Sequence, residues 1–192
     1  FGGINMMKKT LVILTALFLS ACVSPPQLNA PETVEHNKKT YHLATKQDLE
    51  SVVRYFYVLP NESAQHWQSA VEILLDRNKQ KRTLQERIDW RKRIYTNTGI
   101  KNFHLYAQDN TLYAYVIYEP SVENKDWQID VAKGKELPFC GFVQYQYSLK
   151  IPKNHKMMNM NGKRVINHLK KYVVEKEIKQ LMKADWLLSC KA

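Results

Sequence analysis

The sequence predicts a single α+β domain with three N-terminal helices, a three- to four-stranded antiparallel sheet, and a long C-terminal helix packed on one face of that sheet. Three observations predict this fold class. Apolar residues recur at helical spacing between residues 46 and 95, alternate as in strands between 103 and 151, and return to helical spacing from 163 to 188. A helical half followed by a run of strands is typical of helices that cover an antiparallel sheet.

The first two predicted helices cover residues 46–58 and 61–75. Thr45 and Asp48 have the spacing of a capping box before the first helix, and a proline at position 60 ends it. An asparagine at position 61 is a favourable N-cap for the second helix. The apolar residues of each segment form one helical stripe: Leu49, Val52, Val53, Phe56 and Tyr57 in the first, and Ala64, Trp67, Ala70, Val71, Leu74 and Leu75 in the second.

The third predicted helix begins after Thr83. Thr83 and Glu86 have capping-box spacing, and the apolar stripe continues through Tyr95 to Gly99, a residue that often ends helices. These three helices make the N-terminal half of the predicted domain helical.

The middle of the chain predicts β-structure. Residues 103–107 and 111–118 form a hairpin around the turn at 108–110, and residues 126–131 form a short edge strand. Residues 142–151 alternate between apolar and polar side chains, which predicts one face in the core and one face in solvent.

The last predicted element is a helix over residues 163–188. Its apolar residues again recur at helical spacing, and the charged residues 176–177 interrupt the stripe. We therefore expect the helix to bend near that point.

The N-terminal residues have the pattern of an export signal. Lys8 and Lys9 precede an apolar run over residues 10–19, which is shorter than the roughly 20 residues that a membrane-spanning helix needs. The run ends in Leu19-Ser20-Ala21-Cys22, and the whole arrangement resembles the signal peptide and lipobox of bacterial lipoproteins. The resemblance implies that residues 1–21 are removed and that Cys22 carries a lipid. The alternative is a secretory signal that is cleaved elsewhere, with Cys22 an ordinary thiol.

The resemblance also implies a location. Val23 stands where lipoproteins retained in the inner membrane commonly have aspartate, so we expect an outer-membrane protein whose domain faces the periplasm. A surface-exposed domain and a single-membrane host are alternatives. Residues 1–5 precede two methionines and are interpreted as upstream sequence. Residues 22–40 contain three prolines and no period, which predicts a lipidated tether, and residues 41–192 are predicted to form a single domain.

The chain is strongly basic. Without the predicted signal and its two lysines it has 27 Lys and Arg against 18 Asp and Glu, a formal net charge of +9. In an exported protein this charge favours anionic lipids, lipopolysaccharide or acidic protein surfaces as partners and argues against nucleic acid.

Lipidation of Cys22 leaves Cys140 and Cys190 as an even pair in an oxidising compartment. We therefore predict a disulfide between them, which pins the end of the last helix to the loop before residue 142. The alternative is Cys140 as a nucleophile, although no local signature of a catalytic cysteine accompanies it.

Two basic clusters are candidate binding surfaces for a protein partner or an anionic ligand. The first consists of Lys79, Lys81, Arg82, Arg87, Arg91, Lys92 and Arg93, and the second of Lys150, Lys153, Lys156, Lys163, Arg164, Lys170 and Lys171. The alternative for each cluster is a solvated surface that keeps the domain soluble. If the two clusters share one face, the binding interpretation is favoured.

Three weaker patterns have simpler explanations. His155, Met157, Met158 and Met160 are the only suggestion of a metal site, of a kind that suits Cu(I), but methionines also fill gaps under loops. The tyrosines 113, 115, 118, 145 and 147 form either a stacking platform for a sugar or cross-strand core pairs. His66, His104 and Asp109 are isolated from any hydrolytic motif. We expect no cofactor and no catalytic residues.

The sequence as a whole predicts a noncatalytic, membrane-anchored envelope lipoprotein whose basic domain binds a protein partner in envelope assembly or secretion. Two alternatives remain: a binding module for anionic lipid or lipopolysaccharide, and a periplasmic enzyme of unknown reaction. No pattern in the chain specifies an oligomeric state.

Overall fold

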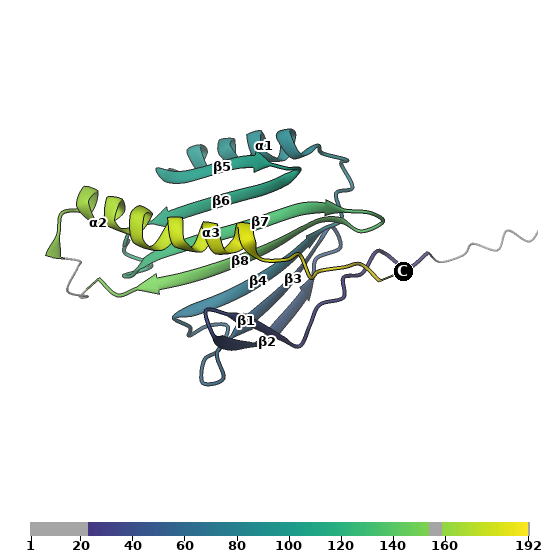
Figure 1. Cartoon of the computed structure of the whole chain (residues 1–192), viewed down its shortest axis with the longest axis horizontal. Coiled ribbons are helices and arrows are strands. Elements are labelled where there is room, and N and C mark those ends of the chain that lie inside the picture. Colours follow the sequence, from purple (N-terminus) through teal and green to yellow (C-terminus); the bar gives the residue numbers. More distant parts are fainter. Residues whose placement is uncertain (1–22, 154–158, 192) are drawn as a thin grey trace, which may run out of the picture.

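The computed structural model describes residues 23–153 and 159–191, which fold around one eight-stranded antiparallel sheet (Figure 1). The strands are β1 Thr33–His36, β2 Lys39–Asp48, β3 Val52–Val58, β4 Ser69–Asp76, β5 Asn102–Gln108, β6 Thr111–Tyr118, β7 Trp127–Leu137 and β8 Gly141–Ile151. They lie in the order β1-β2-β3-β4-β8-β7-β6-β5. The chain thus forms two four-stranded halves in succession, which join where β4 pairs with β8.

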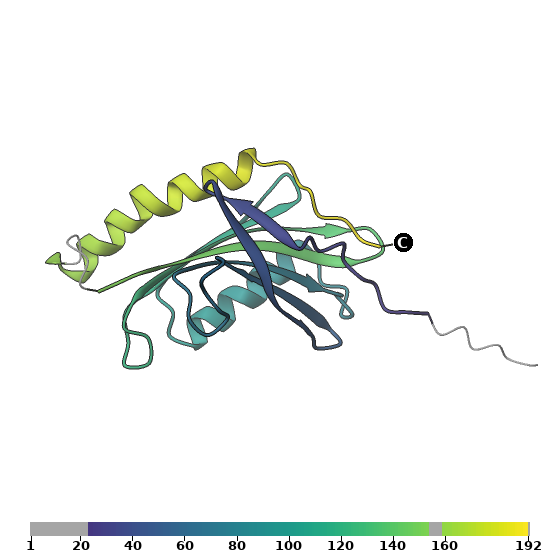
Figure 2. The same cartoon turned by 90° about the horizontal axis from the view of Figure 1, so that it is seen from below.

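Helices lie on both faces of the sheet (Figure 2). They are α1 Leu84–Asn97, α2 Gly162–Leu169 and α3 Glu175–Lys183, with a π-helical turn over Lys170–Val174 that makes α2 and α3 one continuous element. Helix α1 packs through Ile88 on a small apolar cluster that includes Phe142. The C-terminal helix packs through Leu169 and Leu181 on the larger core, formed mainly by the opposite face of β3, β4, β7 and β8.

The sheet curls around the C-terminal helix, so strands that are distant in the sheet both reach it. His36 of β1, at one edge, lies 2.9 Å from the carboxylate of Glu177 in α3. Lys133 of β7, near the other edge, donates a hydrogen bond of 2.9 Å to the carbonyl of Leu181. The curvature follows from the twist that antiparallel strands adopt, and it places β1 beside α3.

Two of the three predicted N-terminal helices are wrong. Residues 46–58 contain the end of β2, a turn and β3, in which Val53, Tyr55 and Tyr57 are buried at every second position. Residues 61–75 contain a loop and β4. Adjacent apolar residues fit helical and strand spacing equally well, and the β-branched and aromatic content of these segments favours the strand.

The predicted sheet of three to four strands is too small. Residues 126–131, predicted as an edge strand, belong to β7, which lies inside the sheet between β8 and β6. In residues 142–151 the apolar face is in the core as predicted, but Gln144 and Ser148 of the expected solvent face are buried as well. The N-terminal strands enlarge the sheet, β8 pairs with the side of β7 away from β6, and α1 covers the second face of β8.

The predicted tether is mostly part of the domain. Leu28 is buried, and β1 and the start of β2 lie within residues 22–40. Tyr57 of β3 donates a hydrogen bond of 2.8 Å to the carbonyl of Pro31. The folded domain therefore begins near residue 27 and not at residue 41.

The C-terminal helix is shorter than predicted. It ends at Lys183 and not at residue 188, and the segment beyond it is extended. The irregularity in the helix is the π-helical turn over residues 170–174. Glu177, expected to interrupt the apolar stripe, is buried instead because it has polar partners on β1.

Two local predictions are confirmed. Thr83 caps α1, and both hydrogen bonds of the capping box with Glu86 are present. β5 and β6 form the predicted hairpin, in which Asp109 and Asn110 have φ values of 51° and 55°. Positive φ at both turn residues is typical of the tightest hairpin turns, and Asp and Asn tolerate it well.

The two ends of the described chain lie together at one end of the sheet. Leu28 forms a β-bridge with Cys190, and the amide of Asn29 donates to the carbonyl of Ser189 at 2.9 Å. Cys190 is in turn bonded to Cys140, in the turn between β7 and β8, by the disulfide that the cysteine count predicts. The C-terminal segment is therefore held between the N-terminal segment and the sheet.

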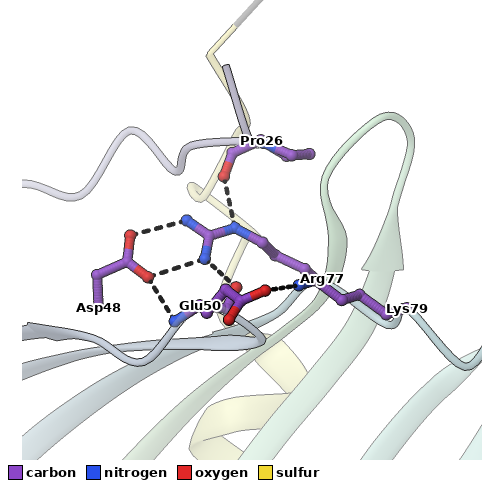
Figure 3. A network of polar contacts seen from close by, with 5 residues as sticks. All are labelled: Pro26, Asp48, Glu50, Arg77 and Lys79. Atoms are coloured by element: carbon purple, nitrogen blue, oxygen red, sulfur yellow. Dashed lines mark hydrogen bonds and ion pairs between the residues drawn. The ribbon is translucent and has the colours of Figure 1, made fainter. Parts of the chain in front are cut away.

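Arg77 fastens the N-terminal segment to the turn between β2 and β3 (Figure 3). Its guanidinium donates two hydrogen bonds of 2.9 Å to the carboxylate of Asp48 and one of 3.1 Å to the carbonyl of Pro26. A further bond reaches the carbonyl of Glu50. The guanidinium of Arg77 lowers the pKa of Asp48 to about 2, so this carboxylate stays ionised at neutral pH.

Candidate functional site

A pocket of about 1020 Å³ lies between β1, the end of α3 and the extended C-terminal segment. One wall is formed by residues 29–38, which include β1, and the other by the end of α3 and residues 184–188. Ile73, Lys133 and Tyr145, from three strands of the sheet, also line it. The pocket lies where the sheet curls toward α3 and the C-terminal segment, which the disulfide fastens to the turn between β7 and β8.

The lining is mainly apolar. Ala30 and Val34 come from the β1 wall, and Leu181, Trp186 and Leu188 come from the opposite wall. Leu187 also lines the pocket and is 88% exposed, so it lies at the rim. A concave, mostly apolar pocket with a few polar groups is typical of a small-molecule site.

Lys133 is the most buried of the charged side chains that line the pocket. Its side chain is buried, and its ammonium donates to the carbonyls of Leu181 and Ala184 at 2.9 and 2.8 Å. Burial disfavours the charged form and, with the nearby charge of Lys135, lowers the pKa of Lys133. An ammonium has three hydrogens, so one remains for an anionic or polar ligand group.

His36 and Glu177 connect the two walls of the pocket. His36 Nε2 donates to the Glu177 carboxylate at 2.9 Å, and Asn37 donates to the other oxygen at 2.7 Å. His36 Nδ1 shares a hydrogen bond of 2.9 Å with the hydroxyl of Tyr145, and its ring stacks on Tyr147 at 4.0 Å. Burial raises the pKa of Glu177, but the hydrogen bonds from His36 and Asn37 outweigh it, and the pKa lies below its ordinary value.

Trp186 adds a polar group to the same wall. Its indole Nε1 is buried and has no hydrogen-bond partner among the described residues. The ammonium of Lys135 lies 5.3 Å from the centre of the indole ring. A buried donor without a partner is costly, so a ligand that accepts a hydrogen bond here would be favoured.

We expect the link between His36 and Glu177 to be important for stability. Replacing Glu177 with alanine leaves His36 and Asn37 without their acceptor and should lower the free energy of unfolding by about 3 kcal/mol in urea denaturation at neutral pH. Glu175→Ala, an exposed change in the same helical turn, is the control and should have little effect. An equal loss in both variants would contradict the assignment.

The same pair predicts a pH dependence. The pKa of Glu177 is lowered in the folded protein, so its stabilising contribution is complete above its ordinary value of 4.5 and is lost as the pH falls through the lower folded value. The stability difference between wild type and Glu177→Ala should therefore shrink in acid. A difference that is constant with pH would contradict the prediction.

Two members of the first basic cluster are internal. The Arg87 side chain is 1% exposed, donates to Asp76 at 2.6 Å and lies 4.1 Å above the ring of Phe142. Arg91 donates to Gln144, a buried residue of β8. The expectation of a binding surface is wrong for these two arginines, because the helix face that carries them packs on the sheet.

The other members of that cluster lie at the surface or near it. Lys79 pairs with Glu50 at 2.7 Å, and the guanidinium of Arg82 lies 4.3 Å from the ring centre of Trp90. Lys81, Lys92 and Arg93 are exposed. Arg82 and Lys79 thus have partners within the fold, and the cluster is not one continuous patch of free charge.

The second basic cluster lies around the end of β8 and on α2, whereas the first surrounds α1. Lys153, Lys163, Arg164 and Lys171 are exposed, Lys170 is half-buried, and Lys156 lies outside the described residues. Lys150 lies 3.9 Å from the ring centre of Trp67. Because α1 and α2 pack on opposite faces of the sheet, the two helices do not combine the clusters on a single face.

The tyrosines and the candidate metal ligands do not form a binding site among the described residues either. Of the five tyrosines, Tyr118 lies on the α1 face, while 113, 115, 145 and 147 lie on the opposite face. Tyr113 and Tyr147 are buried there, and Tyr115 and Tyr145 pack against the larger core. Met160 packs against the larger core. His155, Met157, Met158 and the lipidation candidate Cys22 lie outside the described residues. Within the described ranges, no group of three or more His, Cys, Asp and Glu side chains is arranged to hold a metal.

Sequence reasoning missed the pocket. Its walls are formed by residues that the sequence predicts to be a tether and the end of the last helix. Neither of these predictions points to a binding site. Two signals were present in the chain: Lys133 stands in an apolar strand, and Glu177 stands in the apolar stripe of a helix. A charge at such a position indicates a buried polar partner, although not which one.

Comparison with known proteins places the chain in a family. A protein-family model matches residues 28–186, which is most of the domain. The chain belongs to this family. A relative from Haemophilus influenzae (strain ATCC 51907 / DSM 11121 / KW20 / Rd), named "Uncharacterized protein", is 46% identical over 191 residues, covering 96% of this chain and 99% of the relative. No solved structure matches. The family match begins at Leu28, the first buried residue of the described chain, in agreement with the corrected start of the domain.

Proposed function

We propose that the protein is a noncatalytic, lipid-anchored envelope protein that binds an anionic amphiphile, with the acyl chain in the pocket between β1 and the C-terminal segment. The observation that carries the proposal is the pocket itself, of about 1020 Å³ and lined mainly by apolar side chains. A lipid on Cys22 anchors the protein in the outer membrane, and the domain faces the periplasm.

The charged residues of the lining favour an anionic head group. Lys38, Lys133 and Lys191 line the pocket, together with the acidic residues Glu35 and Asp185. Lys133 is the most buried of these charges and has one ammonium hydrogen beyond its two hydrogen bonds, and the indole N–H of Trp186 in the same lining has no partner among the described residues. An apolar chain with a carboxylate or phosphate head matches this combination.

The short connection to the anchor supports a lipid as the ligand. Five residues separate Cys22 from Leu28, a span of at most about 20 Å. The pocket wall begins at Asn29, so a lipid on Cys22 would hold the pocket close to the membrane surface. An amphiphile leaving the bilayer would then meet the pocket directly.

No catalytic step is assigned to the pocket. His36 is the residue there that most resembles a general base, and hydrogen-bond partners within the fold occupy both of its ring nitrogens. This arrangement favours a role in holding β1 against α3.

The test uses a fatty acid that carries a photoreactive diazirine, added to isolated outer membranes that contain the full-length protein. After irradiation, mass spectrometry of peptides should locate crosslinks in residues 29–38 and 180–191. The methyl ester of the same acid lacks the anionic head and should crosslink less. Crosslinks spread evenly over the surface would refute a specific pocket.

A variant that fills the pocket gives a quantitative prediction. Val34→Trp adds bulk to the β1 wall and should reduce crosslinking by the photoreactive fatty acid at least tenfold, because the acyl chain and the indole compete for the same volume. The control is Val122→Trp, a change at a 97% exposed position far from the pocket, which should crosslink like the wild type. Equal crosslinking in all three proteins would argue against the proposal.

A protein partner in envelope assembly or secretion is the second candidate. It is favoured by β5, which stands at the end of the strand order and presents one unpaired backbone edge among the described strands. His104 and Tyr106 of this strand stack at 5.2 Å on the same side of the sheet as α3. In-cell crosslinking that recovers one defined envelope protein through β5 would support this candidate.

A further inference from the structure

One end of the sheet gathers several turns and both ends of the described chain. Val52 pairs with Asp76, and Asp76 pairs with Phe142, so the turn between β2 and β3 and the turn between β7 and β8 lie at the same end. Pro26 is bonded to Arg77 there (Figure 3), and the amide of Lys191 donates to the carbonyl of Gln27 at 2.8 Å. We call this the anchor end: residues 23–27, 48–51, 77–82, 137–141 and 190–191.

The turns of the anchor end present apolar side chains to solvent. Phe139, in the turn between β7 and β8, is 97% exposed, and Leu49, in the turn between β2 and β3, is 60% exposed. Val23, next to the predicted lipid site, is 88% exposed. Residues in tight turns are usually small or polar, so a phenylalanine and a leucine at these positions suggest a function outside the fold.

The backbone at Phe139 strengthens this argument. Its φ of 66° is in the left-handed region, which is unfavourable for a bulky residue. Almost all of its surface is exposed, so packing within the fold does not compensate for the strain. Strain of this kind that persists in a structure is a reason to look for a functional contact.

The charges around these side chains suit an anionic surface. Asp48 is bound by Arg77, and Glu50 is paired with Lys79, so two of the acidic groups of the anchor end are neutralised. Lys81 and Lys191 are exposed and have no partner among the described ion pairs, and the same is true of one acidic residue beside the β7–β8 turn, Glu136. Exposed apolar residues beside lysines are characteristic of protein surfaces that rest on anionic membranes.

We infer that the anchor end rests on the membrane, with Phe139 and Leu49 inserted at the boundary between the lipid head groups and the acyl chains. The inference rests on the lipid anchor of the proposed function. A lipid on Cys22 brings the anchor end to a bilayer, and for this reason we infer that its exposed side chains contact a membrane and not a protein. Only three residues separate Cys22 from Pro26, a distance of at most about 14 Å. The lipid therefore keeps the turns within reach of the bilayer, and the side chains fix the orientation of the domain.

The test places a tryptophan at the tip of the turn. The full-length lipidated variant Phe139→Trp is reconstituted into vesicles of phosphatidylethanolamine and phosphatidylglycerol with brominated acyl chains, which quench tryptophan emission on contact. The matched control is Val122→Trp, at a position that is also 97% exposed but lies beyond the opposite end of β7. Wild-type protein supplies the emission of the four native tryptophans for subtraction.

We expect the emission added by Phe139→Trp to be quenched by at least half and the emission added by Val122→Trp to remain unquenched. Equal quenching, or none at position 139, would overturn the inference. Flotation of the vesicles distinguishes failure of the inference from failure of the lipid anchor. Protein that floats without quenching at position 139 refutes only the docking of the anchor end. Lipidated protein that fails to float would refute the membrane anchor and, with it, the inference.

Discussion

Replacing Gly141 with alanine is expected to lower the free energy of unfolding by about 4 kcal/mol, the sum of backbone strain and a steric clash at the start of β8. Gly141 has a φ of 128°, which side chains rarely permit. A Cβ atom here would lie 2.2 Å from the carbonyl oxygen of Asp76 and 2.9 Å from the Cα of Arg77. Both are backbone atoms of the neighbouring strand and its continuation, so a rotamer change cannot relieve the clash.

The surroundings of Gly141 prevent an easy adjustment. Cys140, the preceding residue, is held by the disulfide, and Phe142, the following one, is paired with Asp76 of β4. This is the seam where the two halves of the sheet join. A shift there would disturb both halves, which is why we expect a large effect from one methyl group.

Urea denaturation of Gly141→Ala and Gly99→Ala checks the prediction. Gly99 also has a positive φ, 79°, but a Cβ atom there would have no neighbour within 4 Å. Gly99→Ala therefore measures the conformational cost alone, about 1–2 kcal/mol. The explanation fails if the two variants lose the same stability.

Removal of the disulfide is expected to have a comparable effect. The double variant Cys140→Ser/Cys190→Ser opens a loop with a sequence separation of 50 residues. In the chain-entropy model, a loop of this size contributes about 4 kcal/mol by restricting the unfolded chain. Urea denaturation should show this loss, and adding a reductant to the wild type should reproduce it while leaving the double variant unchanged.

The disulfide should also affect the pocket. It holds one end of the C-terminal segment whose residues 184–188 form a wall, and α3 holds the other end. Without it, crosslinking by the photoreactive fatty acid should fall. An unchanged urea midpoint in the double variant would refute the stabilising role, and unchanged crosslinking would refute the role in shaping the wall.

The predictions from the sequence were correct where neighbouring residues determine the structure. Thr83 and Glu86 cap each other three residues apart, and the turn at Asp109 and Asn110 accommodates positive φ in two adjacent residues. Each of these contacts joins residues that are at most three positions apart, so the residue types at those positions are sufficient to predict it.

The predictions failed where distant strands determine the structure. Residues 46–58 and 61–75 have apolar residues that fit either a helix or a strand, and they become strands because β2, β4 and β8 supply hydrogen-bond partners. Residues 28–40 lack a period because they form an edge of the sheet, with partners on α3 and in the C-terminal segment.

The candidate site illustrates the same division. The pairing of Cys140 with Cys190 followed from the number of cysteines, but His36, Lys133 and Leu181 are distant in sequence and only the curled sheet brings them around one pocket. Likewise, Arg87 and Arg91 are indistinguishable from surface arginines until α1 is placed on the sheet.

By itself, the sequence determined the cap of α1, the hairpin of β5 and β6, the position of β8 and the disulfide. The first three depend on residue types a few positions apart. The disulfide was predicted because two cysteines are left to pair once Cys22 is assigned to the lipid. Only the tertiary structure decided the size of the sheet, the start of the domain and the pocket between β1 and the C-terminal segment. These depend on which strands pair across the whole chain, and that pairing is set by the burial of both sheet faces and not by any local period.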